Sequence, residues 1–199
     1  MMARIKKLNF PDRAAMKFRL APDNRIAQLP LLIEILRQPL NGNLRDIRTR
    51  IRAAYALALL SPKDVLPAKE ALLEILKNPE DPISPVSVEI INNLGPSEET
   101  IPALLCQLKA ESYSSREKAA YMLGCIGAEA ACAIPALSSA LEQDIFRLVR
   151  ASIVEALGKI GSPLALPALN QALKDDHESV RLLARDAIAA VADQGIYGN

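Results

Sequence analysis

Residues 149–161 read Val-Arg-Ala-Ser-Ile-Val-Glu-Ala-Leu-Gly-Lys-Ile-Gly, and the interpretation of the whole chain starts from this stretch. Its apolar residues recur at helical spacing, which places them on one stripe of an α-helix. Gly161 follows the last apolar residue and is a signal for the end of a helix. The stretch therefore predicts an amphipathic helix whose apolar stripe must be covered, and the stripe consists of Val149, Ile153, Ala156, Leu157 and Ile160.

Related stretches occur five times along the chain. They close with Leu60-Ser61, Leu94-Gly95, Ile126-Gly127, Ile160-Gly161 and Val191-Ala192. A column of similar residues stands eleven positions before each of these ends, namely Arg50, Ser84, Arg116, Arg150 and Arg181. Four of the five are arginine, so the stretches are repeats of one structural unit.

A proline phrase precedes each of these stretches. The phrases are Leu29-Pro30-Leu31-Leu32, Leu66-Pro67-Ala68-Lys69, Ile101-Pro102-Ala103-Leu104, Ile134-Pro135-Ala136-Leu137 and Leu166-Pro167-Ala168-Leu169. Proline suits the first turn of a helix, where its missing N–H would have no intrahelical partner. Each unit is therefore predicted to be a hairpin of a helix A, which starts at the phrase, and a helix B, which ends at the closing pair.

Such hairpins cannot bury both of their apolar stripes alone, but a stack of them forms a continuous core. We expect an all-α solenoid with repeats at approximately 26–62, 63–98, 99–130, 131–163 and 164–195. Residues 1–25 do not match the repeat. They are basic, and two interpretations remain open: a cap helix over the first repeat, or a basic docking arm.

Two stretches carry a resemblance to a known family. Residues 113–127 and 149–161 resemble the second helix of HEAT repeats, and in particular the short HEAT-like repeats of phycobilisome bilin lyases. The resemblance implies a right-handed α-solenoid (α-α superhelix) of about five HEAT-like helical hairpins with an N-terminal cap helix. It also implies that the arginine column bonds Asp or carbonyl groups between repeats, with Asp144 and Asp175 as candidate acceptors six residues before Arg150 and Arg181. Unit two departs from the pattern at Ser84.

Composition excludes several classes of protein. The chain has 199 residues, 50% of them hydrophobic, and a net charge of +1. This balance is typical of a soluble folded chain. No apolar run is long enough to cross a membrane and no secretory leader is recognisable. The three cysteines, Cys106, Cys125 and Cys132, lack metal or disulfide spacing, so we expect small, buried, reduced side chains in a cytoplasmic protein.

Catalytic and metal-binding patterns are missing from the sequence. The single histidine, His177, falls in a polar turn and is expected to be solvated. One turn histidine supports no Ser-His-Asp arrangement, and the isolated glycines form no phosphate-binding loop. No residue is therefore assigned to catalysis or to a metal, and the protein is expected to be non-enzymatic.

The near-neutral total conceals a charge asymmetry. Residues 1–62 hold 12 Lys or Arg and 4 Asp or Glu, whereas residues 63–199 hold 12 and 19. A basic end of this kind attracts acidic partners over a distance. Two interpretations remain open, an acidic protein partner and a solvated face without a partner, and both are favoured over nucleic acid because few aromatic residues interleave with the basic ones. The residues expected to steer this partner are Arg4, Lys6, Lys7, Arg45 and Arg48.

The B helices are expected to line the concave face of the solenoid. Tyr55 and Tyr121 fall at the same position of different repeats, and tyrosine is an effective anchor at protein interfaces. The alternative is that both rings pack between repeats. The residues predicted to contact a partner are Arg52, Tyr55, Glu89, Lys118, Tyr121, Glu155 and Lys159.

Two functions follow from these observations. The first is a protein-binding adaptor or assembly chaperone that works without a cofactor. The second rests on the resemblance alone: a subunit of a bilin lyase or phycobiliprotein-processing factor that binds a phycocyanobilin-type bilin. There, Arg52 and Lys118 would face the propionates. A homodimer stays open in either case.

Overall fold

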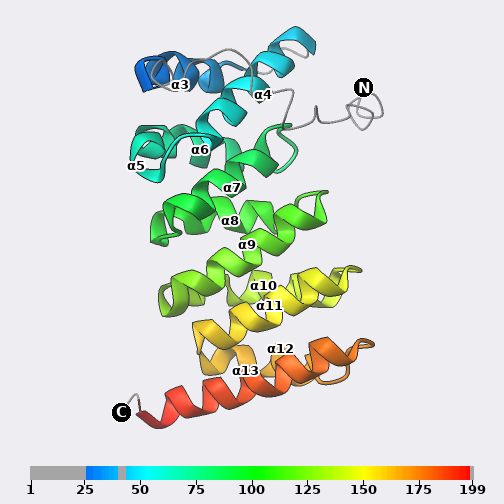
Figure 1. Ribbon diagram of the computed structural model, residues 1–199. Coiled ribbons are helices and arrows are strands. Elements are labelled where there is room, and N and C mark those ends of the chain that lie inside the picture. Colours follow the sequence, from blue (N-terminus) through cyan, green and yellow to red (C-terminus); the bar gives the residue numbers. More distant parts are fainter. Residues whose placement is uncertain (1–25, 40–43, 198–199) are drawn as a thin grey trace.

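The computed structural model describes residues 26–39 and 44–197, and the side chains up to Asp193. Within these residues all secondary structure is helical. Five helical hairpins follow one another along this part of the chain and stack into an elongated solenoid (Figure 1). The predicted all-α solenoid of about five helical hairpins is thus confirmed, while the expected N-terminal cap helix in residues 1–25 lies outside the described residues.

Each hairpin supplies one helix to each of two rows. In Figure 1 the B helices cross the front of the molecule as a row of diagonal rods, with the A helices behind them. The A helices are α3 (Leu29–Arg37), α6 (Lys69–Leu76), α8 (Ile101–Gln107), α10 (Ile134–Gln143) and α12 (Leu166–Ala172). The B helices are α4 (Leu44–Ala58), α7 (Ser84–Leu94), α9 (Tyr113–Ile126), α11 (Arg147–Ile160) and α13 (Glu178–Tyr197). Short helices join the hairpins: α5 (Pro62–Val65), η1 (Leu66–Ala68), η2 (Glu98–Thr100), η3 (Gly127–Ala133) and η4 (Pro163–Ala165).

The helix boundaries follow the local sequence signals with two exceptions. Gly95, Gly127 and Gly161 end three B helices with φ angles of 89°, 77° and 71°, a region that favours glycine. In the second hairpin, however, the proline phrase forms the 3₁₀ turn η1, and α6 starts only at Lys69. Helix α13 continues past Val191 to Tyr197, because Ala192 stands where other repeats have glycine and does not stop a helix.

One hydrophobic core runs along the described chain from Leu29 to Val191. The five apolar residues predicted for the stripe of α11 are all at most 2% exposed. Burial of such side chains is the main source of stability, because each repeat covers the apolar face of its neighbour. The continuous core is the physical reason why the hairpins form one unit.

Two glycines set the distance between the last three B helices. A Cβ atom on Gly124 would lie 2.8 Å from the Cα of Ala156 in α11. A Cβ atom on Gly158 would lie 3.0 Å from the Cα of Ala187 in α13. The backbones of α9, α11 and α13 therefore approach so closely that these positions accept no side chain.

The corresponding positions in the first two hairpins hold larger residues. Gly124 and Gly158 precede the closing residue by three positions, where α4 has Ala58 and α7 has Asn92. The positions of Ala156 and Ala187 correspond to Ile90 in α7. These side chains keep α4, α7 and α9 further apart than the later B helices.

Two further sequence expectations meet the structure here. The stretch Tyr113–Gln143 contains an 18-residue window with the hydropathy of a membrane span, but it forms α9, η3 and α10, and 44% of that window is buried inside the solenoid. Its apolar character belongs to the core between repeats.

All three cysteines are free, as expected, but the expectation of burial is wrong for Cys125 and Cys132, which are exposed at the end of α9 and in η3.

Candidate functional site

The residues predicted to contact a partner all lie on B helices. Arg52, Tyr121, Glu155 and Lys159 are exposed, and the others are half-buried. They come from four consecutive B helices that lie side by side at the front of the molecule (Figure 1). We call the solvent-facing side of α4, α7, α9, α11 and α13 the B-helix face.

Tyr121 lies at the centre of a small cluster on this face. Its ring is 46% exposed, and the Lys159 ammonium lies 5.2 Å from the ring centroid. Lys159 also lies 4.0 Å from the Glu155 carboxylate on α11. A side-chain hydrogen bond with Cys125 raises the pKa of the Tyr121 phenol, and the charges of Cys125 and Glu155 raise it further. The phenol therefore stays neutral at physiological pH and can donate a hydrogen bond to a partner.

Lys118 and Glu89 join two helices of the B-helix face. The Lys118 ammonium on α9 lies 3.9 Å from the Glu89 carboxylate on α7. Both side chains are partly exposed, and such pairs add little stability because water competes for each charge. The two residues therefore form part of a polar surface and contribute little to holding α7 and α9 together.

Tyr55 has the same repeat position as Tyr121 but another environment. It lies on α4, is half-buried and packs against the hydrophobic core. The alternative of packing between repeats therefore describes Tyr55 in part, whereas Tyr121 is available to a partner.

The steering residues divide between two parts of the chain. Arg45 and Arg48 are exposed on α4, on the same helix as Arg52. Arg4, Lys6 and Lys7 lie outside the described residues. The basic surface that the structure does place is therefore α4.

The arginine column is structural. Arg116 in α9 binds the carboxylate of Asp144, and Arg150 in α11 binds that of Asp175, each with two guanidinium nitrogens. The hydrogen bond from Arg150 holds the pKa of Asp175 below its usual value, and the same bond raises the pKa of Arg150. Arg50 pairs with Asp81 across the first two repeats through one guanidinium nitrogen at 3.1 Å, with both side chains 7% exposed, and another of its nitrogens donates to the Leu36 carbonyl at 3.0 Å.

Asp144 and Asp175 accept from the arginine column, as expected, and each uses both its carboxylate and its carbonyl. The arginines that follow them in the sequence bind the backbone carbonyls. Arg150 reaches the Asp144 carbonyl at 3.0 Å and Arg181 reaches the Asp175 carbonyl at 2.7 Å. The carboxylates instead bind the arginine of the preceding repeat, since a bidentate pair across the junction satisfies both charges.

The column is interrupted between the second and third repeats. Ser84 replaces the arginine and donates to the carbonyl of Asn78 at 2.8 Å. Ala110 occupies the position of the aspartate, so both members of the ion pair are replaced together. Gln107 from α8 donates instead to the carbonyl of Leu76 across this junction, at 2.7 Å. At this junction a neutral hydrogen bond from Gln107 stands in place of the bidentate ion pair.

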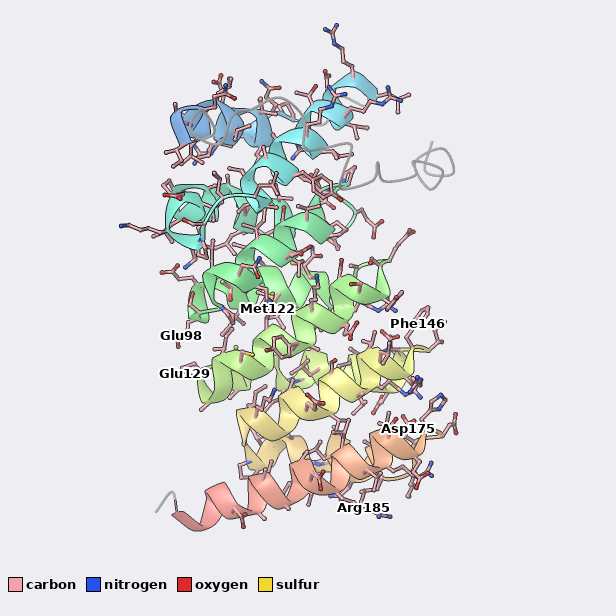
Figure 2. All side chains as sticks on the ribbon, in the orientation of Figure 1. Glu98, Met122, Glu129, Phe146, Asp175 and Arg185 are labelled. Carbon is pink, nitrogen blue, oxygen red and sulfur yellow. The ribbon has the colours of Figure 1, made fainter. Side chains whose placement is uncertain are left out.

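Sequence reasoning missed an apolar patch at the edge where helices A turn into helices B. Tyr113 and Phe146 stack with ring centroids 5.0 Å apart, and the Arg116 guanidinium lies 5.6 Å from the Phe146 centroid. Figure 2 shows Phe146 at this edge, near Asp175. Ile145 is 83% exposed and Leu148 is 47% exposed. We call Tyr113, Ile145, Phe146 and Leu148 the turn-edge patch. The apolar pair Ile145-Phe146 directly after the short turn at Asp144 is the signal that could have indicated it.

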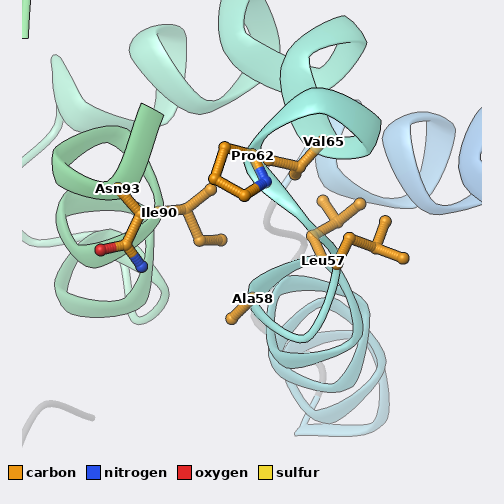
Figure 3. Close-up of a pocket in the computed structure, with 7 residues that line it drawn as sticks. Leu57, Ala58, Pro62, Val65, Ile90 and Asn93 are labelled. Carbon is orange, nitrogen blue, oxygen red and sulfur yellow. The ribbon is translucent and has the colours of Figure 1, made fainter. Parts of the chain in front are cut away.

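Sequence reasoning also missed a cavity between α4 and α7. It has a volume of about 240 Å³ and opens between α4, α5 and α7 (Figure 3). Its lining is apolar apart from Asn93, and consists of Leu57, Ala58, Leu60, Pro62, Val65, Ile90 and Asn93. Ile90 stands where α11 and α13 have alanine, and this larger side chain keeps α4 and α7 from closing on each other. A comparison of this position across repeats could have predicted the cavity.

The single histidine of the chain lies among the described residues. His177 is exposed in the turn before α13, as predicted, where its backbone N–H donates to Asp175 at 2.9 Å. In the described ranges, no group of three or more His, Cys, Asp or Glu side chains is placed to hold a metal ion.

Comparison with known proteins agrees with this architecture. The HEAT-repeat family profile matches residues 101–189. The chain is 31% identical over 131 residues to deoxyhypusine hydroxylase of Eremothecium gossypii, an alignment that covers 65% of this chain. The chain spans only 38% of the length of that relative.

Solved structures share the fold at lower identity. The complex of CpcE and CpcF of phycocyanin lyase from a Nostoc species is 23% identical, with a TM-score of 0.60 over 91% of this chain and 68% of the other. A designed armadillo repeat protein in complex with the peptide (KR)4 is 19% identical, with a TM-score of 0.59 over 95% and 98%.

These solved structures resemble the chain in fold, and the profile identifies the repeat type. The expected resemblance to HEAT repeats is confirmed, and a phycocyanin lyase complex shares the fold. Residues 101–189 match HEAT repeats, and they lie in a helical solenoid whose described hairpins begin at α3.

Proposed function

We propose that the protein binds another protein along the B-helix face and serves as an adaptor or assembly chaperone. The observation that carries this proposal is the cluster around Tyr121, in which a 46% exposed ring is flanked by a lysine 5.2 Å away. A rigid, exposed aromatic ring with charged neighbours buries much area at a small entropic cost, as interface anchors do. Helices from five repeats extend this surface on both sides.

Related solenoids support the same kind of function. One structural neighbour is a complex of two lyase subunits, and another is a repeat protein in complex with a peptide. Repeat solenoids expose long surfaces suited to extended partners. In this chain the aromatic and charged side chains of α9 and α11 would provide the contacts.

The test compares two tyrosines of one helix. Tyr121 and Tyr113 both lie on α9 and are 46% and 45% exposed, but Tyr113 belongs to the turn-edge patch. The tagged chain would be used to capture partners from a native lysate, quantified by mass spectrometry. We expect Tyr121→Ala to abolish capture of the specific partner and Tyr113→Ala to preserve it. Capture that survives Tyr121→Ala would contradict the proposal, and the reverse pattern would move the interface to the turn edge.

The bilin-binding alternative rests on one observation, the shared fold with a phycocyanin lyase complex at 23% identity. Its proposed contacts, Arg52 and Lys118, lie on α4 and α9 and are separated by α7. Lys118 already pairs with Glu89. Mixing the full chain with phycocyanobilin and recording the visible spectrum tests this function, because a bound bilin shifts its absorption. An unchanged spectrum would remove it.

A further inference from the structure

We propose that the cavity between α4 and α7, together with the arginine stripe of α4, binds a peptide segment that carries an apolar anchor followed or preceded by carboxylates. This inference rests on the proposed function, since it assigns the chemistry of the partner at one end of the B-helix face. It uses residues that the Tyr121 cluster does not include.

A single stripe of α4 leads from cations to the cavity. Arg45, Arg48, Arg52, Tyr55 and Leu59 follow one another at spacings of three and four residues, so their side chains share one side of the helix. The arginines are exposed, and Leu59 is 55% exposed just beyond the end of the helix. From Arg45 to Leu59 the stripe measures about 21 Å at the usual helical rise. This length matches about four turns of a helical segment or a shorter extended one.

The apolar end of the stripe reaches the cavity. Ala58 lines it next to Leu59, and Ile90 of α7 forms part of the opposite wall, as Figure 3 shows. A volume of about 240 Å³ accommodates one or two aliphatic or aromatic side chains. Leu57, Val65 and Ile90 give the cavity buried apolar walls, so an anchor side chain gains contacts on entry without the desolvation of a charge. Asn93 at the wall offers an amide to a partner backbone.

Charge decides the chemistry of the rest of the segment. The exposed side chains of the stripe beyond Tyr55 are arginines, and arginine binds carboxylates with two parallel hydrogen bonds. The carboxylate of α7 nearest to this groove, Glu89, is already paired with Lys118 at 3.9 Å. Residues 1–25 of the chain contain seven Lys or Arg and two Asp, so this segment would be repelled by the stripe. An acidic segment of a partner is therefore the complementary occupant.

The experiment uses the full chain and a displayed library of random 12-residue peptides. We expect the enriched peptides to combine a Leu, Ile, Met or Phe with at least two Asp or Glu. The best peptide would then be synthesised with a fluorophore and its binding measured by anisotropy. Ala58→Met, which fills the cavity, should weaken binding at least tenfold, and so should Arg52→Glu on the exposed stripe.

The matched control is Ala189→Met, which places the same side chain at the same repeat position on the exposed side of α13. It should leave the peptide affinity within twofold. No enrichment, enrichment of basic peptides, or affinity that Ala58→Met and Arg52→Glu leave unchanged would overturn the inference. Peptides that lose affinity in Tyr121→Ala but not in Ala58→Met would refute the anchor cavity and still support the B-helix face. Thermal unfolding of each variant confirms that the solenoid is intact.

Discussion

The last three hairpins and the first two use the same hydrophobic stripe but pack their B helices differently. Between α9, α11 and α13, a glycine on one helix meets an alanine on the next, and a Cβ on either glycine would lie within 3.0 Å of the facing backbone. Between α4 and α7, Ala58 and Ile90 keep the helices apart and leave a cavity of about 240 Å³. We call a junction closed where a glycine faces an alanine and open where Ala58 faces Ile90. These facing positions thus determine how closely two B helices pack.

The ion pairs follow this division only in part, because Arg50 also pairs with Asp81 across the first two repeats, through one guanidinium nitrogen. Arg116–Asp144 and Arg150–Asp175 tie the closed junctions with bidentate bonds. The junction of the second and third repeats lacks this pair, and the side-chain oxygen of its Gln107 has no hydrogen-bond partner among the described residues. A polar atom left without a partner in a buried site costs about 1–3 kcal/mol. The comparison teaches that the B helices pack closely in the C-terminal half of the solenoid and leave more space in the N-terminal half, where the proposed anchor cavity lies.

The largest expected effect comes from placing a side chain at the close contact between Gly124 of α9 and α11. Gly124→Leu would force α9 away from α11, because even a Cβ would lie 2.8 Å from the Cα of Ala156. Overpacking of this kind should reduce the free energy of unfolding by about 3 kcal/mol. The measurement is urea unfolding followed by circular dichroism.

Asn92→Leu is the matched control for this substitution, since Asn92 occupies the same repeat position in α7. We expect it to change stability by less than about 1 kcal/mol, because this position already accommodates a side chain. Equal destabilisation by both leucines would show that the two halves do not differ in packing.

The next largest effect concerns the ion pair between Arg150 and Asp175 in the C-terminal half. Asp175→Ala leaves Arg150, whose side chain is only 12% exposed, without its carboxylate. Loss of one member of a largely buried pair should destabilise the protein by about 2 kcal/mol, whereas exposed Asp176→Ala should cost less than about 0.5 kcal/mol. Thermal or urea unfolding of the two neighbouring variants measures this difference.

The pH dependence of the same pair has a definite sign. The pKa of Asp175 is lowered in the folded state by its bonds to Arg150, from an ordinary value of 3.8. Its stabilising contribution is therefore complete above that ordinary pKa and is lost as the pH falls through the lower, folded pKa. The stability gap between the native chain and Asp175→Ala should stay constant from neutral pH down to about pH 5 and shrink below about pH 4. A gap that grew on acidification would contradict the assigned pair.

How far the sequence predicted this structure depends on the kind of contact. Repetition of the proline phrase and of the closing Leu-Gly or Ile-Gly pair predicted hairpins because these signals act within one helix. The role of Arg116 and Arg150 followed from resemblance, but their exact acceptors did not, because the carboxylates come from the next repeat. Tyr55 and Tyr121 have identical repeat positions and different exposure, since the space around each ring is set by neighbouring helices. The cavity beside Ala58 arises from a mismatch between two helices and is invisible to a single-helix pattern.

A smaller effect is expected from restoring the Arg–Asp pair that is missing between the second and third repeats. Ser84→Arg and Ala110→Asp would rebuild the pair found at the other junctions. Each substitution alone should destabilise the chain, because Ser84 and Ala110 are buried and a lone charge there has no partner. Together they should recover a coupling energy of about 1 kcal/mol in a double-mutant cycle by urea unfolding. If the effects of the two substitutions on the free energy of unfolding simply add, this junction cannot form the ion pair.

The smallest expected effect separates binding from stability on the B-helix face. Lys118→Ala removes a contact of 3.9 Å to Glu89 between partly exposed side chains. Because water screens such a pair, the free energy of unfolding should change by less than about 0.5 kcal/mol. If the face binds a partner, the same variant should still weaken capture of that partner severalfold, since a charge at an interface contributes to orientation and specificity. Loss of stability without loss of capture would assign Lys118 to the scaffold that joins α7 and α9, and would leave Tyr121 and Lys159 as the contacts of the face.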